Sequence, residues 1–94
     1  MDDSANQRWQ WSLRRIEAPQ AWNVTRGARD VVVAVVDSGV DPDHPELAGR
    51  VLRGFNVVHP NKPSHDDNGH GTAVAGLVAA RGQNGRGCAG VAPE

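Results

Sequence analysis

The amino-acid sequence predicts an α/β fold with a mostly parallel sheet, and two stretches carry that prediction. Residues 31–36 are Val-Val-Val-Ala-Val-Val, apolar and mostly β-branched without alternation, which is typical of a strand buried on both faces. The residues that follow His70, as far as about Ala80, are mostly small and apolar and predict a helix that packs closely against neighbouring backbone. A strand buried on both faces needs helices to cover it, so both patterns favour one layered architecture.

Three further segments complete the prediction. Pro19 suits the first turn of a short helix that ends near Asn23. Residues 40–47 contain two prolines and are expected to form a loop rather than a helix. Residues 49–58 form a second strand candidate, whose apolar members are Val51, Leu52, Phe55, Val57 and Val58.

Length, charge and cysteine content exclude several classes of function. A chain of 94 residues is one small domain. Its formal net charge of -1 provides no electrostatic case for binding nucleic acid or a membrane surface. The single cysteine, Cys88, excludes an internal disulfide. We expect neither an export signal nor a membrane segment in this sequence, because no apolar run approaches the length of a spanning helix.

A carboxylate and an imidazole stand where an α/β sheet would bring them together. Asp37 directly follows the predicted strand, at the edge where open α/β sheets place their ligands, although an Asp that merely begins a turn is common. His70 stands at the start of the predicted helix, and the alternative to a functional role there is that of a helix cap. A carboxylate that holds one imidazole nitrogen lets the other act as a general base. Such pairs are common, so the pairing alone does not decide the function.

Two other interpretations remain open from the residues. One is a metal site, since carboxylate and imidazole ligands suit transition metals. The sequence lacks both the helical zinc template and the calcium-loop template. The other is a binding module without catalysis. The candidate ligands of a metal site are Asp37, Asp41, Asp43, His44, Asp66 and His70.

Four blocks of the sequence together resemble subtilisin-like serine proteases. These blocks are residues 33–40, 44–47, 69–76 and 90–93, in the order and at close to the spacing of that family. The resemblance implies that residues 1–10 are an N-terminal extension. It implies that residues 11–94 are a partial peptidase domain, the N-terminal part of a three-layer fold, truncated before the nucleophile.

The resemblance also implies roles for individual residues. Asp37 is expected to orient the imidazole, His70 to be the general base, and Ser38 to hydrogen-bond beside the aspartate. The nucleophilic serine and the oxyanion-hole asparagine of the family follow its Gly-Val-Ala-Pro block. We therefore expect this chain alone to be inactive and the complete enzyme to hydrolyse polypeptides as a serine endopeptidase.

Three finer expectations rest on the resemblance. Residues 11–16, 47–51 and 70–73 are similar to actinobacterial members such as the mycosins. Family members are often secreted or located at the cell surface. A structural calcium site is also expected, because calcium prefers hard oxygen ligands; the alternative is a polar surface loop. The positions that match the calcium ligands of the family are Gln7, Glu46 and Asn84.

Overall fold

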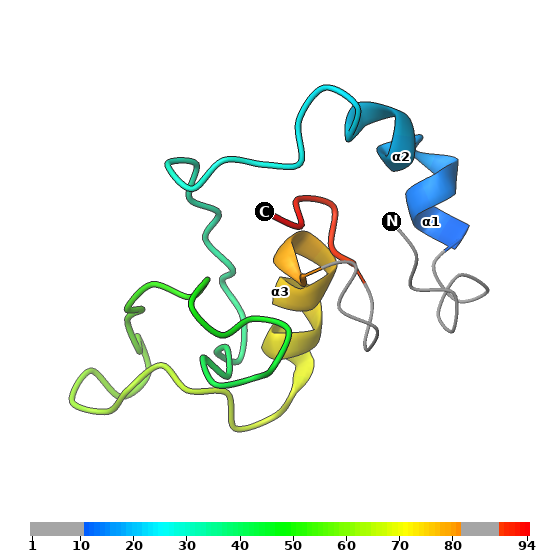
Figure 1. Cartoon of the computed structure of the whole chain (residues 1–94). Coiled ribbons are helices and arrows are strands. Elements are labelled where there is room, and N and C mark those ends of the chain that lie inside the picture. Colours follow the sequence, from blue (N-terminus) through cyan, green and yellow to red (C-terminus); the bar gives the residue numbers. More distant parts are fainter. Residues whose placement is uncertain (1–10, 82–88) are drawn as a thin grey trace.

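The structure is a computed structural model that describes residues 11–81 and 89–94. Its regular elements over these residues are the helices α1 (Trp11–Arg15), α2 (Ala18–Ala21) and α3 (His70–Ala79), labelled in Figure 1. Pro19 lies in the first turn of α2, as the sequence predicts. The bounds of α3 agree with the predicted helix to within one residue. In the part of the chain that the structure describes, no helix has the length and apolar character needed to cross a membrane.

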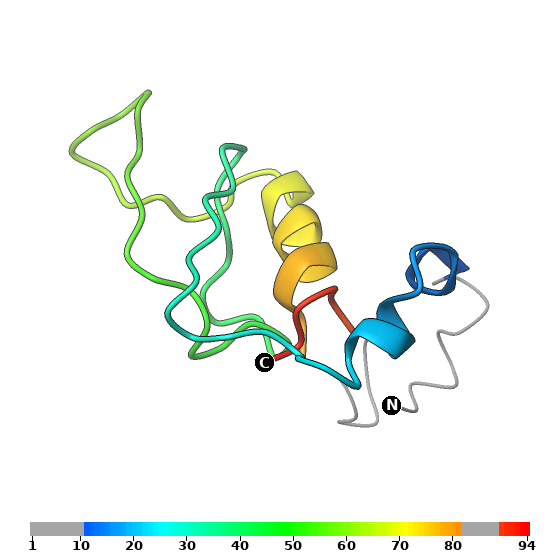
Figure 2. The ribbon, with the colours of Figure 1, turned by 90° about the horizontal axis from the view of Figure 1, so that it is seen from above.

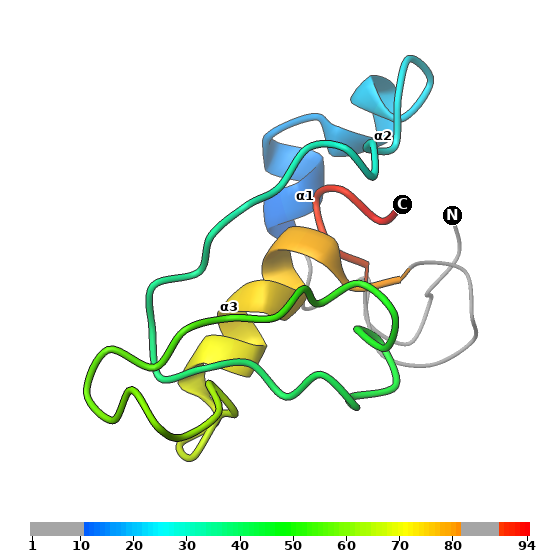
Figure 3. The same cartoon turned by 90° about the vertical axis from the view of Figure 1, so that its left-hand side faces the viewer.

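Helix α3 lies between the other parts of the described chain. Residues 29–69 lie on one side of α3, and α1 and α2 lie on the other (Figures 1 and 2). Residues 89–94 lie between α3 and the first two helices (Figure 3). The N–H groups of Val91 and Ala92 donate to the carbonyls of Leu77 and Val78 at 3.0 and 2.8 Å. These bonds attach the C-terminal residues to the last turn of α3.

The predicted strands do not appear as strands among the described residues. Residues 31–36 run as irregular, extended chain without ladder partners. Val31, Val32, Val33 and Val36 are 58% to 96% exposed, so the predicted burial on both faces does not occur here. The physical reason is that a strand forms only when a second segment pairs with it, and residues 49–58 do not do so. The α/β architecture stays a prediction.

A small core gathers where the loop after residue 40 and the C-terminal residues meet the end of α3. The predicted loop at residues 40–47 is a series of turns. Leu47, the last residue of this loop, is 2% exposed. Nη1 of Arg50 donates to the carbonyl of Ala79 at 3.3 Å. The N–H of Arg81 donates to the carbonyl of Glu46 at 3.1 Å. The buried apolar residues are Ala18, Leu47, Ala75, Ala80, Ala89 and Pro93. This core holds the C-terminal half of α3 and leaves its first turn free to face Asp37.

Candidate active site

Asp37 and His70, which are distant in the sequence, lie side by side in the structure. The Nδ1 atom of His70 lies 2.9 Å from Oδ1 and 2.8 Å from Oδ2 of Asp37. Asp37 is placed by the end of the extended residues 31–36, and His70 is the first residue of α3. The pairing predicted from the sequence is therefore present in the structure.

The chemistry of the two groups decides which ring nitrogen carries the proton. An ionised carboxylate only accepts hydrogen bonds, so Nδ1 of His70 must be the donor. The remaining nitrogen, Nε2, is then the one that can accept a proton from a substrate or a nucleophile. The His70 side chain is 69% exposed while that of Asp37 is 19% exposed. The carboxylate side chain is thus less open to solvent than the imidazole ring.

Ser38 supports the carboxylate, as expected from the resemblance. Its backbone N–H donates to Oδ1 of Asp37 at 2.6 Å. This bond, followed by the hydrogen bond from His70, holds the pKa of Asp37 below its ordinary value of 3.8. Asp37 is therefore ionised at neutral pH and keeps Nδ1 of His70 in its donor form.

The first turn of α3 obtains its caps from three side chains outside the helix. The first N–H groups of a helix lack partners within it. The N-cap residue, Gly69, has no side chain to supply one. Instead, the side-chain oxygen of Asn68 accepts from the N–H of His70 at 3.3 Å. Oγ of Ser38 accepts from the N–H of Gly71 at 3.0 Å, and Oδ2 of Asp66 accepts from the N–H of Thr72 at 2.9 Å.

Of the three side chains that cap α3, Asp66 accepts the most hydrogen bonds. Its Oδ1 accepts from the N–H groups of Asn68 and Gly69 and from Oγ of Ser38, at 2.9, 2.8 and 2.8 Å. Its Oδ2 accepts from both the N–H and the hydroxyl of Thr72. These hydrogen bonds hold the pKa of Asp66 well below its usual range, and the bond from the N–H of Gly69 has the largest effect.

From the sequence, Asp66 is a candidate only for a metal ligand. A local feature indicates its actual position, because a helix that begins after Gly69 needs an acceptor from elsewhere. A carboxylate a few residues upstream is well placed to supply it. The contacts with Ser38, by contrast, depend on the fold and have no signature in the sequence.

In the described part of the chain, the residues of the alternative metal site do not gather around one point. Among residues 11–81 and 89–94, no three His, Cys, Asp or Glu side chains are grouped so that they could hold a metal ion. Of the expected calcium ligands, only Glu46 is described, and it is 6% exposed. Gln7 and Asn84 lie outside the described residues, as does Cys88. One buried carboxylate and two amide oxygens would suit calcium chemically. The calcium site remains a prediction.

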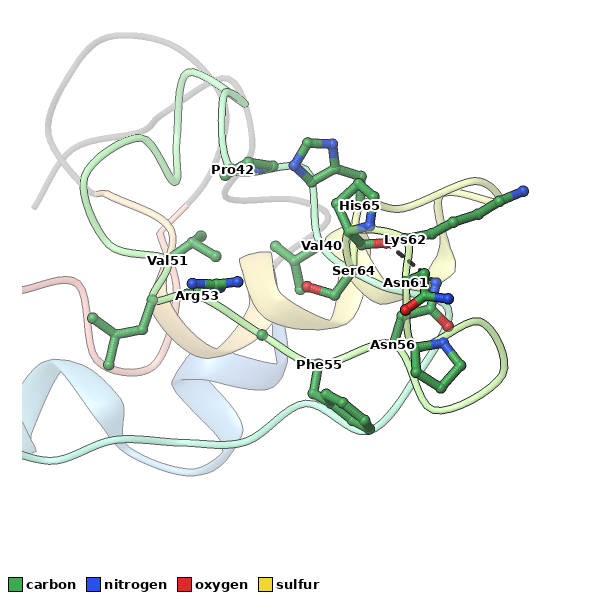
Figure 4. A pocket seen from close by; sticks show the side chains of 14 residues that line it. Val40, Pro42, Val51, Arg53, Phe55, Asn56, Asn61, Lys62, Ser64 and His65 are labelled. Carbon is green, nitrogen blue, oxygen red and sulfur yellow. Dashed lines mark hydrogen bonds between the residues drawn. The ribbon is translucent and has the colours of Figure 1, made fainter.

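Two cavities lie apart from the pair. One, of about 630 Å³, is lined by residues 40, 42, 51–56 and 60–65. Figure 4 shows Val40, Ser64 and His65 among the side chains that line it. The other, of about 810 Å³, includes Asp66 and Thr72 in its lining. Asp37 and His70 are not among the residues that line either cavity, although Gly69, beside His70, lines the second.

Comparison with known proteins identifies relatives of this sequence. The Subtilase family matches residues 28–94. Thermitase of Thermoactinomyces vulgaris is 42% identical over 85 residues, which are 90% of this chain and 30% of that protein. An intracellular serine protease of Paenibacillus polymyxa is 49% identical over 86 residues, 87% of this chain and 26% of that protein. A thermophilic serine proteinase of Bacillus sp. (strain AK1) is 40% identical over 93 residues, 99% of this chain and 23% of that protein.

These matches establish the family but not a subfamily. The chain spans less than a third of the length of these curated relatives. The expected likeness to actinobacterial, mycosin-like members gains no support from them. The family match covers more than half of the chain and contains both Asp37 and His70. The chain therefore belongs to the subtilase family.

Proposed function

We propose that this chain supplies the acid–base pair of a subtilisin-like serine endopeptidase. The observation that carries the proposal is the 2.8 Å contact between His70 Nδ1 and Asp37 Oδ2. The names of the relatives, which include serine proteases and a serine proteinase, favour the same reaction. Polypeptides are accordingly the proposed substrates of the complete enzyme.

The proposed reaction uses the two ring nitrogens of His70 differently. Nε2 accepts the proton of a serine hydroxyl while the serine oxygen bonds to the peptide carbonyl carbon. Asp37 stabilises the imidazolium that results and keeps the ring oriented. The same proton then passes from Nε2 to the leaving amine nitrogen as the peptide C–N bond breaks. Water then bonds to the acyl carbonyl carbon while Nε2 accepts its proton, and the proton passes to the serine oxygen as the ester C–O bond breaks and the carboxylic acid leaves.

The serine in this reaction is proposed to belong to the rest of the catalytic domain. Ser38 is engaged with Asp66 and Gly71, and Ser64 lines a cavity apart from the imidazole. The oxyanion-hole asparagine is assigned to the same further part of the domain. Loss of the nucleophile lowers kcat by about 10⁶-fold in a serine protease, so the 94-residue chain alone should not hydrolyse peptides.

The α/β fold and the calcium site form part of the same proposal. The exposed valines at 31–36 provide an apolar surface for neighbouring strands of the complete domain, and Glu46 is the described candidate for a calcium ligand. A location outside the cell remains a weaker part of the proposal. The relatives in Bacillus subtilis include both a minor extracellular protease, Epr, and a major intracellular serine protease.

A chimeric enzyme tests the proposed function. The chain replaces the matching segment of thermitase, to which it is 42% identical, and the product is assayed with a fluorogenic peptide. The chimera should hydrolyse the peptide, and a serine-directed phosphonate should stop it. Asp37→Asn should lower kcat by about 10⁴-fold, because the wrong tautomer of His70 then faces the nucleophile.

His70→Ala completes the test and should also abolish most of the rate. The 94-residue chain alone, with the same peptide and inhibitor, is the control for activity that comes from elsewhere. A folded chimera without turnover would overturn the proposal, and so would one whose turnover survives His70→Ala. Serine-dependent turnover by the chain alone would overturn the assignment of the nucleophile to another segment.

A further inference from the structure

We propose that Asp66 is a positioning residue for the Asp37–His70 pair, acting through Ser38 and the first turn of α3. The inference rests on the proposed function, since it assigns a residue that prepares the general base for that reaction. Asp66 does not contact Asp37 or His70 by any hydrogen bond in the structure. Its influence comes from the groups that it holds.

The first route runs through Ser38. The hydroxyl of Ser38 donates to Asp66 Oδ1 at 2.8 Å, which orients its oxygen to accept from the N–H of Gly71 at 3.0 Å. The backbone N–H of the same serine donates to Asp37 at 2.6 Å. One residue therefore links the Asp37 carboxylate to the helix that carries His70, and Asp66 determines how its hydroxyl points.

The second route runs through the helix start. The N–H groups of Asn68, Gly69 and Thr72 all donate to the carboxylate of Asp66, and these bonds fix the turn that leads into α3. His70 lies inside that turn, so its Cα position depends on these bonds. The hydroxyl of Thr72 also accepts from the N–H of Asp41 at 2.9 Å, which ties the loop after Asp37 to the same turn.

The chemistry of a carboxylate suits this position better than that of an amide. Five hydrogen bonds reach Asp66, and every one comes from an N–H or O–H donor. An asparagine accepts only through its oxygen, so its NH₂ group would face donors on one side or the other. Asp66→Asn should therefore weaken one route or both without changing the size of the side chain.

The pKa of Asp37 separates positioning from a simple effect of charge. Removing a nearby negative charge lowers the pKa of a carboxyl. Loss of the hydrogen bonds from Ser38 and His70 instead raises the pKa of Asp37 toward its ordinary value of 3.8. The two explanations thus predict opposite directions for the same measurement.

The experiment is a carbon-detected NMR titration of Asp37 in the 94-residue chain and in the thermitase chimera. It is accompanied by the downfield proton resonance of His70 Nδ1–H. In Asp66→Asn the pKa of Asp37 should rise and the resonance should broaden or disappear. Asp67→Asn is the matched control, since it removes an exposed neighbouring charge that makes none of these bonds. It should leave the resonance intact.

Kinetics in the chimera provide the second measurement. Asp66→Asn should lower kcat by about 10²-fold with KM nearly unchanged, because the imidazole is misplaced by about 1 Å rather than removed. If Asp66→Asn fails to fold, Ser38→Ala decides, because it cuts the first route and leaves the bonds of Asp66 to Gly69 and Thr72. Loss of the His70 Nδ1–H resonance in that variant supports the proposal, because the pKa of Asp37 also depends directly on the Ser38 side chain.

Two outcomes would overturn the inference. One is a lower or unchanged pKa of Asp37 in Asp66→Asn with the Nδ1–H resonance retained. The other is a His70 Nδ1–H resonance that is retained in a folded Ser38→Ala chain. Failure of the proposed function is distinguishable, since it appears as an inactive chimera with Asp66 intact. The NMR measurements need no turnover and decide the role of Asp66 separately.

Discussion

Replacing Gly71 with alanine should separate His70 from Asp37 without touching either side chain. Gly71 is buried in the first turn of α3, against the backbone of Gly39. An added Cβ would lie 3.0 Å from both N and C of Gly39 and closer still to its carbonyl oxygen. Ordinary contact begins at 3.4 Å, so the two backbones must move apart by roughly 1 Å.

A separation of that size is enough to break the pair. The Nδ1–Oδ2 distance is 2.8 Å, and a further 1 Å or so takes it beyond hydrogen-bonding range. Overpacking of this kind costs about 1–3 kcal/mol of folding free energy. A misplacement of about 1 Å at a catalytic group lowers the rate by about 10²-fold. Gly71→Ala should therefore lose both stability and the Nδ1–H resonance of His70.

Gly76→Ala is the matched control within the same helix. A Cβ at Gly76 meets no atom within 4 Å, so this variant should gain about 1 kcal/mol from the better helix propensity of alanine. Both variants share that gain, so the difference in their unfolding free energies measures the contact with Gly39. Urea denaturation and the His70 resonance are the assays. Equal stabilities for the two variants, with the resonance intact in Gly71→Ala, would refute the reasoning.

Two further predictions concern the hydrogen bond of Trp22 and the ionisation of Asp37 and Asp66. Trp22→Phe should lower the unfolding free energy by about 1 kcal/mol in urea denaturation, because Nε1 of Trp22 donates to the carbonyl of Val91 at 2.8 Å. Trp11→Phe, at a side chain that is 64% exposed, should have little effect. Acid should destabilise the site for a separate reason. The pKa values of Asp37 and Asp66 lie below 3.8 in the folded chain, so their stabilisation is complete above that pH and declines as the pH falls through the lower values. Helix content followed by circular dichroism should fall over this range, and less steeply in Asp66→Asn. An acid transition unchanged in that variant would contradict the assignment.

The sequence predicted the elements that depend on neighbouring residues. Helix α3 has a continuous run of small residues, and α2 has a proline in its first turn, so both patterns are local. The short helix α1 was missed, because its five residues have no apolar spacing that distinguishes a helix. The strand at residues 31–36 was predicted from its valines. Whether a strand forms depends on a partner segment that no local pattern specifies.

The candidate site was predicted unevenly for the same reason. Asp37 and His70 were identified because each stands at the end of a recognisable element. The resemblance then linked the two residues across the intervening loop. Asp66 was predicted only as a metal ligand, and its hydrogen bond with Ser38 joins two distant segments and has no signature in the sequence. Hydrogen bonds between distant segments cannot be predicted from local sequence patterns.

The acid–base pair and the apolar segment before it rely on different kinds of contact. Short polar contacts among residues 37–41 and 66–72 hold the pair, and the carbonyl of Ser64 accepts from the N–H of Val40 at 3.3 Å. The valines at 31–36 are exposed and can be buried only by other segments. In the structure the pair is in contact although residues 31–36 form no paired strand. Under the proposed function, the rest of a subtilase domain would add the nucleophile to a pair that is already in contact.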